Sequence, residues 1–252
     1  EVLAGERRVA GVGVDAGVGL GDGVATGEGE GTGAGSDAAS DAVSDDGATV
    51  VYCVGRTLYA TTGSPGAPRA LGVGRPLAFS PDGAQVLVTH TPPQSVLANG
   101  GFSTVRVSDG VTAALPVPPA NLGEVKNARW DARGPRAITY DDPTRGLFIL
   151  DLATGASVRA ATTSESPDAV AFNARGDGAI YATGRCVDSS GFRCTNTEYV
   201  LRLAVPGAPE RTIARGYTGT GAGLVGFGVP AISPAGDRIA FVFNTNLYVK
   251  PL

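Results

Sequence analysis

Nucleophilic catalysis in this sequence would have to use one histidine, His90, because the 252 residues contain no other. A Ser-His-Asp or Cys-His device needs a histidine beside its nucleophile as the general base. His90 ends a β-rich run and precedes a segment that contains Pro, Asn and Gly, and no G-x-S-x-G or phosphate-loop sequence occurs. We therefore expect a surface or edge histidine here, and we predict no catalytic residue.

Two of the three cysteines, Cys186 and Cys194, lie eight residues apart with Ser and Gly between them. This spacing in a loop-like segment predicts a local disulfide in an oxidising compartment. Zinc is disfavoured because the sequence has no C-x-x-C pair and its only histidine is distant. Cys53 stands within the apolar run 50–54, so we expect a buried thiol there.

An acidic group consisting of Asp37, Asp41, Asp45 and Asp46 offers the hard oxygen ligands that Ca²⁺ prefers. However, Asp45-Asp46-Gly47 is already explained as a turn, in which an Asp side chain bonds the local backbone and Gly adopts a positive φ. We therefore predict no cofactor, with calcium as the alternative.

The elements that would position these residues are indicated by the composition, which includes 38 Gly, 17 Pro and only 17% charged residues. Such punctuation predicts an all-β fold of many short strands, and it argues against a helical bundle or a doubly wound α/β fold. The net charge is −4 and no run of Lys or Arg occurs, so nucleic acid is not expected as a partner. Because no stretch of 18 apolar residues is present, we expect no membrane span in this chain.

One phrase recurs along the chain: a small apolar pair, a polar residue, a turn with Asp or Gly, and then a β-rich run. It begins at Ala42, Ala78, Ala128, Ala171 and Ala231. Its turn has the chemistry of a hairpin, because Pro presets φ, Asp or Ser bonds the local backbone and Gly supplies a positive φ. A second and, in most units, a third strand-like segment follow each run. Four strands per repeated unit predict the blades of a β-propeller.

The repeats also resemble a known family. AFSPDG at 78–83, ILDLATGASVRA at 149–160 and AISPAGDRIAFVFNTNLYV at 231–249 are similar to TolB-type (WD-like) β-propeller repeats. The resemblance covers the chain from about residue 40 to its C-terminus. It implies a β-propeller and an extracytoplasmic location (secreted, periplasmic or cell-surface) in a bacterium. It implies little about function, because propellers host binding, scaffolding and catalysis alike.

We expect one propeller domain over residues 1–252 with five four-stranded blades. The last unit stops at Leu252 after its third strand, and residues 3–10 have the pattern of a turn and an outer strand. We predict that this N-terminal strand completes the fifth blade and closes the ring, with 11–37 as a flexible Gly-rich insertion. The competing interpretation is part of a ring of six to eight blades.

The long insertions are predicted to lie on one face of the propeller. With the strands of a blade named a to d from the channel outward, the a–b and c–d turns are short. The insertions fall in b–c or d–a connections, which leave the same face: 90–102, 183–197, 11–37 and 216–229. Loops on a rigid scaffold often carry binding residues, although neutral loop drift is the other interpretation.

Aromatic and basic residues of these insertions form our candidate recognition surface: Phe102, Arg185, Phe192, Arg193 and Tyr217. In the alternative interpretation, Phe102 and Phe227 pack beneath the loops.

We therefore predict a non-catalytic extracytoplasmic propeller that binds a protein, peptide or glycan through its loop-rich face. One alternative is a propeller-based hydrolase or lyase, which would need a metal or a cluster of acids with His90. The other is an accessory propeller of a larger peptidase or membrane-anchored protein.

Overall fold

The structure is a computed structural model. It describes residues 42–62, 67–90, 101–116, 123–141, 144–163, 165–167, 169–190, 193–219, 226–233 and 235–252. These residues form nineteen β-strands and no α-helix, which confirms the all-β prediction. Within the described residues, accordingly, no helix is long and apolar enough to cross a membrane.

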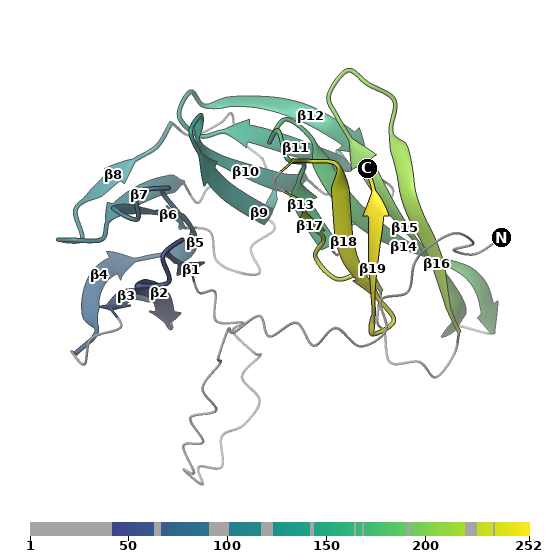
Figure 1. Ribbon diagram of the computed structural model, residues 1–252, viewed down its shortest axis with the longest axis horizontal. Coiled ribbons are helices and arrows are strands. Elements are labelled where there is room, and N and C mark those ends of the chain that lie inside the picture. The colour runs from purple at the N-terminus through teal and green to yellow at the C-terminus, as the bar shows by residue number, and fades with distance from the viewer. Residues whose placement is uncertain are drawn as a thin grey trace, which may run out of the picture.

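The strands form five antiparallel sheets, each built from consecutive strands of the chain (Figure 1). Sheet by sheet, their bounds are β1 Ala42–Val43, β2 Thr49–Val54, β3 Thr57–Thr62 and β4 Arg69–Val73; β5 Arg75–Phe79, β6 Gln85–Thr89, β7 Phe102–Arg106 and β8 Thr112–Ala114; β9 Glu124–Asp131, β10 Gly134–Asp141, β11 Gly146–Asp151 and β12 Ala156–Thr162; β13 Ala169–Phe172, β14 Ala179–Ser190, β15 Arg193–Ala204 and β16 Arg211–Gly219; and β17 Ala231–Ile232, β18 Arg238–Phe243 and β19 Asn246–Pro251. Four sheets have four strands, and the fifth has three among the described residues.

The repeated a–b turn has the predicted chemistry. In the first sheet the Ser44 hydroxyl donates to Asp46 Oδ1 at 2.6 Å and accepts from the Thr49 amide at 2.9 Å. Gly47 completes the turn with a φ of 68°, which a residue with a Cβ adopts only with strain. Ser80 makes the same two kinds of contact in the second sheet, with the same distances. The recurring phrase therefore specifies the same hairpin in successive sheets.

The sheets pack face to face through four clusters of buried apolar residues. One cluster joins the first sheet to the second, and the others join the second to the third, the third to the fourth and the fourth to the fifth. Leu58 with Val86, and Ile180 with Phe241, are examples in the first and last of these clusters. The innermost strands β1, β5, β9 and β13 lie next to one another in that order. This stacking of blade-like sheets around their first strands is a β-propeller arrangement.

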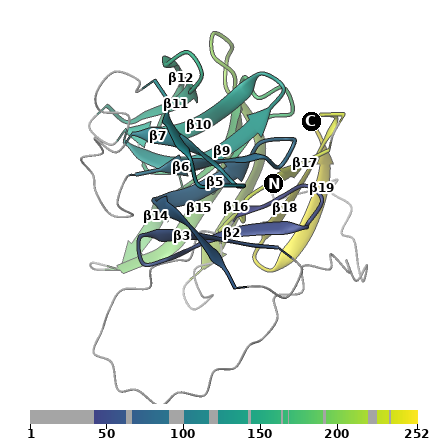
Figure 2. The same cartoon turned by 90° about the vertical axis from the view of Figure 1, so that its left-hand side faces the viewer.

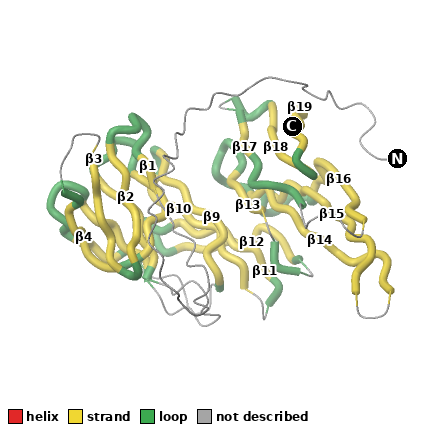
Figure 3. Tube along the Cα trace, turned by 90° about the horizontal axis from the view of Figure 1, so that it is seen from below, coloured by secondary structure: helices red, strands yellow, loops and turns green. Residues whose placement is uncertain are grey.

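The first and fifth sheets lie at the two ends of an arc (Figures 1 and 3). Figure 2 views that arc from the end at which the first two sheets lie. None of the four clusters joins the fifth sheet to the first within the described residues. The predicted closing strand, residues 3–10, and the insertion 11–37 lie outside those residues. Closure of the ring by the N-terminus therefore stays a prediction.

The fourth sheet has the longest strands, because β14 and β15 span twelve residues each. The inner strand β13 pairs only with Ala179–Ala182, so the β14–β15 hairpin continues well past it. The described residues of the segment 183–197, which was expected to be a loop insertion, are thus a continuation of two strands. The predicted disulfide is confirmed: Cys186 and Cys194 are bonded across this hairpin, with their Cα atoms 5.7 Å apart.

Candidate functional site

The two faces of the fourth sheet carry different chemistry because side chains alternate along a strand. Ile180 and Leu201 point toward the fifth sheet and belong to its cluster. Tyr181 points toward the third sheet, and Thr183 and Arg185 follow it at alternate positions on the same face of β14. This face is therefore apolar where β14 pairs with β13, and it is polar where the β14–β15 hairpin extends beyond β13.

A hollow of about 360 Å³ lies over this polar face, between the third and fourth sheets. The third sheet contributes the end of β12 and the connection that follows it, and the fourth sheet contributes β14, β15 and β16. The lining residues are Thr162, Thr163, Glu165, Tyr181, Thr183, Arg185, Glu198, Val200, Arg202, Glu210 and Arg215. Only Val200 among them is an aliphatic residue, so the hollow is strongly polar.

The centre of one half of the hollow is Glu198, whose side chain is only 4% exposed. Strand pairing places Arg185 opposite it on β14 and Tyr217 opposite it on β16. Glu198 Oε2 accepts from Arg185 Nε at 2.7 Å, while Oε1 accepts from the Tyr217 hydroxyl at 3.0 Å. Arg215 Nη1 donates to the same Oε1 at 3.3 Å. Three strands thus converge on one buried carboxylate.

The electrostatics of this group keep Glu198 ionised. Burial by itself would raise the pKa of Glu198, but the hydrogen bonds from Arg185 and Tyr217 and the two guanidinium charges outweigh it. The pKa of Glu198 therefore lies below its ordinary value. Conversely, the hydrogen bond to Glu198 raises the pKa of the Tyr217 phenol.

The two arginines around Glu198 remain largely open to solvent. The side chains of Arg185 and Arg215 are 66% and 58% exposed. A guanidinium has five N–H donors, and the carboxylate takes one from each arginine in the contacts above. Two positive charges and one buried negative charge thus leave outward-facing donors that suit an anionic group of a ligand.

The other half of the hollow pairs its charges internally. The Tyr181 hydroxyl donates to Glu210 Oε2 at 2.9 Å, and burial, followed by this contact, raises the pKa of Tyr181. Arg202 donates from Nη1 to Thr183 Oγ1 at 2.8 Å, and its Nε lies 4.0 Å from the Glu210 carboxylate. This half therefore offers hydroxyl and carboxylate oxygens rather than uncompensated charge.

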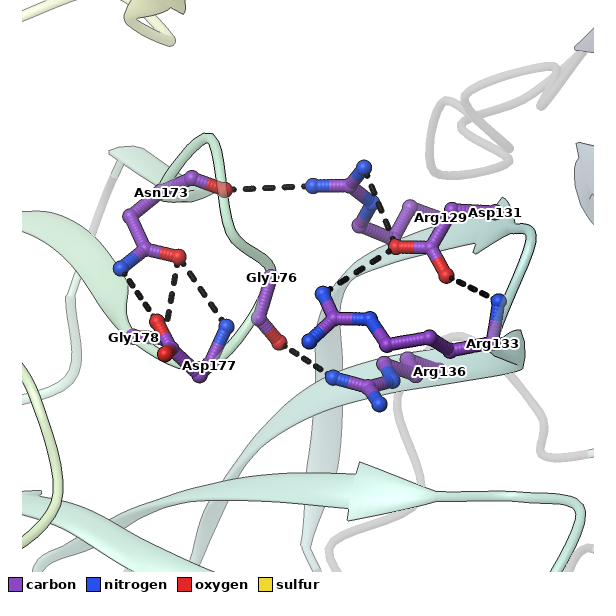
Figure 4. Close-up of polar contacts among 8 residues, drawn as sticks. All are labelled: Arg129, Asp131, Arg133, Arg136, Asn173, Gly176, Asp177 and Gly178. Atoms are coloured by element: carbon purple, nitrogen blue, oxygen red, sulfur yellow. Dashed lines mark hydrogen bonds and ion pairs between the residues drawn. The ribbon is translucent and has the colours of Figure 1, made fainter. Parts of the chain in front are cut away.

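A second polar cluster joins the a–b turns of the third and fourth sheets, which lie at the opposite ends of β10 and β14 from the b–c connections. Figure 4 shows the contacts of this cluster. Asp131, at the end of β9, lies 3.1 Å from Arg129 Nη2 and 3.4 Å from Arg133 Nη2. Burial acts to raise the pKa of Asp131, but the Arg133 amide and the two guanidinium charges lower it overall.

The arginines of this second cluster are tied to the backbone of the next sheet. Arg129 Nη1 donates to the Asn173 carbonyl at 3.1 Å, and Arg136 Nη1 donates to the Gly176 carbonyl at 2.7 Å (Figure 4). Gly176 has a φ of 66°, and a Cβ there would lie 2.7 Å from Arg133 Nη2. The turn of the fourth sheet thus fits closely against the arginines of the third, as expected of a structural joint.

The residues predicted for recognition have different positions. The structure brings Arg185 and Tyr217 together on Glu198. Phe102 is buried between the second and third sheets, as in the alternative interpretation, and Phe227 is buried between the fourth and fifth. Phe192 lies outside the described residues. Arg193 begins β15, but its side chain also lies outside what the structure describes.

The other candidate positions have local roles. His90 Nε2 lies 2.9 Å from Ser103 Oγ, and Ser103 is buried. Asp46 accepts hydrogen bonds within its turn, whereas Asp37 and Asp41 lie outside the described residues. In the part of the chain that the structure describes, no three His, Cys, Asp or Glu side chains are grouped to hold a metal ion.

Sequence reasoning missed Glu198 and Arg215, which complete the site. A usable signal was the period-two pattern Glu198, Val200, Arg202 within a β-rich run, because it places a carboxylate and a guanidinium on one face. The Gly and Ser residues of the preceding segment favour a loop, and they obscure this signal.

Comparison with known proteins supports the fold. No protein-family model matches the chain, and no curated protein matches it. TolB from Acinetobacter baumannii has a similar structure, with a TM-score of 0.51, 17% identity, and coverage of 84% of this chain and 54% of that one. The β-propeller domain of the Trilobed protease from Pyrococcus furiosus has a TM-score of 0.50, 12% identity, and coverage of 84% and 68%. Oligogalacturonate lyase from Vibrio parahaemolyticus has a TM-score of 0.53, 12% identity, and coverage of 84% and 62%.

The chain therefore has a TolB-like β-propeller fold. It spans about half the length of the A. baumannii TolB structure. At these identities the likeness concerns the fold and leaves the role to be argued from the site.

Proposed function

We propose that this chain is a non-catalytic, extracytoplasmic binding module that takes its ligand at the hollow between the third and fourth sheets. The observation that carries the proposal is the pair of largely exposed arginines, Arg185 and Arg215, held in place by the buried Glu198 carboxylate. Preorganised, outward-facing donors are typical of a recognition site, because little side-chain freedom is lost when a ligand binds.

The position of the hollow supports the same proposal. Part of its wall comes from the d–a connection after β12 and from the extended b–c hairpin of the fourth sheet. These are the connection types in which the sequence concentrates its insertions. The disulfide between Cys186 and Cys194 lies next to Arg185 in the chain and supports an oxidising, extracytoplasmic location.

The ligand class in this proposal is a protein, a peptide or a glycan. Its test compares the wild-type chain with the double variant Arg185→Gln/Arg215→Gln, both immobilised and exposed to glycan and peptide arrays. We expect at least one ligand that the wild type retains and the double variant loses. Arg56→Gln is the matched control, because Arg56 is also exposed but lies in the turn between β2 and β3 of the first sheet.

Equal retention of every ligand by the wild type and the double variant would contradict the proposed site. Because the double variant leaves the buried Glu198 carboxylate without its two cations, it should melt several degrees lower than the wild type, and retention is therefore compared at a temperature at which both proteins are folded.

A further inference from the structure

The N–H groups of Arg185 and Arg215 that do not contact Glu198 indicate which charge a bound ligand group should carry. Arg185 uses its Nε and Arg215 uses one Nη for Glu198, so each retains further N–H groups. A planar carboxylate accepts two parallel hydrogen bonds from a guanidinium fork, which a spherical anion cannot do as well. Two such forks beside one buried carboxylate favour an acidic group on the ligand.

The other carboxylates of the hollow limit how much negative charge the ligand can carry. The described lining includes three arginines and three glutamates, so its formal charges balance. A doubly charged phosphate would face more repulsion than a singly charged group from Glu165, Glu198 and Glu210, which all line the hollow. A singly charged carboxylate can bind the two arginines and adds less negative charge next to the three glutamates than a phosphate would.

The remaining walls fit a ligand rich in hydroxyl groups. Thr162 offers a hydroxyl that can donate and accept, Thr183 can still donate while its oxygen accepts from Arg202, and Glu165 and Glu210 offer acceptors. An acidic peptide side chain would bring apolar neighbours, for which Val200 is the only aliphatic contact among the lining residues that the structure describes. The volume of about 360 Å³ lies at the small end of ligand pockets, which suits one or two sugar rings.

We infer that this hollow binds a uronic acid residue of an acidic saccharide, with the sugar carboxylate on Arg185 and Arg215 and the sugar hydroxyls on the threonine and glutamate walls. The inference rests on the proposed function and narrows its ligand class. Glu198 is a positioning residue in this arrangement, because it holds both guanidiniums from below and is itself nearly inaccessible.

The test is a titration followed by NMR, with glucuronate, galacturonate, glucose, galactose, an acidic tripeptide and inorganic phosphate as separate probes. We expect the uronates to shift the resonances of Arg185 and Arg215 and to bind about tenfold more tightly than the neutral sugars. Arg185→Gln/Arg215→Gln should reduce uronate affinity to that of the neutral sugars, whereas Arg56→Gln should retain it. Arg185→Lys/Arg215→Lys, which keeps the charge but loses the forks, should fall between them.

Each contrary result overturns a defined part of the inference. Equal binding of acidic and neutral sugars at the hollow would overturn carboxylate recognition while leaving the hollow as a binding site. Tighter binding of the tripeptide or of phosphate at the same resonances would overturn the saccharide class. If no probe shifts resonances of the hollow, the inference is wrong, and the array comparison above then decides independently whether the proposed function also fails.

Discussion

The two ends of the junction between the third and fourth sheets use arginine and carboxylate side chains for different purposes. At the a–b end, Arg129 and Arg136 donate to backbone carbonyls of the next sheet, and Asp131 neutralises part of their charge. At the other end, Arg185 and Arg215 share one buried carboxylate and leave most of their surface open. Both ends contain arginines, so the presence of arginine does not distinguish them. The difference is that the donors of the structural joint are satisfied by the next sheet, whereas those of the binding site remain open to solvent.

This difference follows from strand length. At the a–b end short hairpins from neighbouring sheets meet, so backbone carbonyls are close enough to accept from arginines. At the other end, β14 and β15 extend past β13, and their polar face lines the hollow together with the end of β12. The part of that face beyond β13 provides the space for the hollow.

The largest effect is expected at the structural end. Asp131→Ala should lower the free energy of unfolding by about 2–3 kcal/mol, because it removes the partner of two arginines and an acceptor for the Arg133 amide. Asp109→Ala is the matched control: Asp109 bonds Arg106 and the Val111 amide within one exposed hairpin, and its loss should cost about 1 kcal/mol or less. Denaturant unfolding measures both, and equal losses would show that Asp131 does not link the sheets.

A smaller loss is expected at Glu198, together with a change in binding. Glu198→Gln should lower the free energy of unfolding by about 2 kcal/mol. The reason is that a neutral amide replaces the buried carboxylate that accepts three hydrogen bonds. It should also weaken ligand binding, because the two arginines lose their common anchor. A variant of unchanged stability and unchanged affinity would contradict the positioning role.

The pH dependence of this difference has a definite sign. The pKa of Glu198 is lower in the folded chain than its ordinary value of 4.5. The stabilisation by ionised Glu198 is therefore fully present above pH 4.5 and is lost as the pH falls through the lowered value. The stability gap between the wild type and Glu198→Gln should be constant near neutrality and shrink below pH 4.5, and a gap that widens there would contradict the assignment.

The smallest effect concerns the close fit of the structural joint. Gly176→Ala should destabilise the chain by about 0.5 kcal/mol more than Gly47→Ala, because the half-exposed end of the Arg133 side chain can shift at low cost. Both glycines occupy the same turn position, with φ near 66° and 68°, so the backbone strain is matched. A Cβ at Gly47 meets nothing within 4 Å, whereas one at Gly176 meets Arg133. If thermal unfolding gives both variants the same loss of stability, the turn at Gly176 does not pack closely against the arginines.

The features that the sequence predicted well are those that depend on near neighbours in the chain. The turn around Ser44, Asp46 and Gly47 is determined by residues within six positions, and so it recurs recognisably along the chain. The Cys186–Cys194 bridge is also local. These two kinds of signal sufficed for the fold class and for the disulfide.

The candidate site was only partly predictable because it depends on strand register. Arg185, Glu198 and Tyr217 meet only because β14, β15 and β16 pair in one particular alignment, with shifts at their bulges. Single-residue character selected Arg185 and Tyr217 but not the carboxylate between them. Phe102 was equally attractive by type, yet packing between two sheets buries it, and such packing cannot be determined from local pattern.

The central claim is that one end of the junction binds while the other end holds the sheets together. The most direct test measures the melting temperature and the affinity for galacturonate of two double variants, Arg129→Gln/Arg133→Gln and Arg185→Gln/Arg215→Gln. We predict that the first variant melts several degrees lower with unchanged affinity. The second variant should lose about tenfold in affinity at a temperature at which it is folded, and it should also melt lower because the buried Glu198 loses both cations. An unchanged affinity of the second variant, or a weakened affinity of the first, would contradict the account.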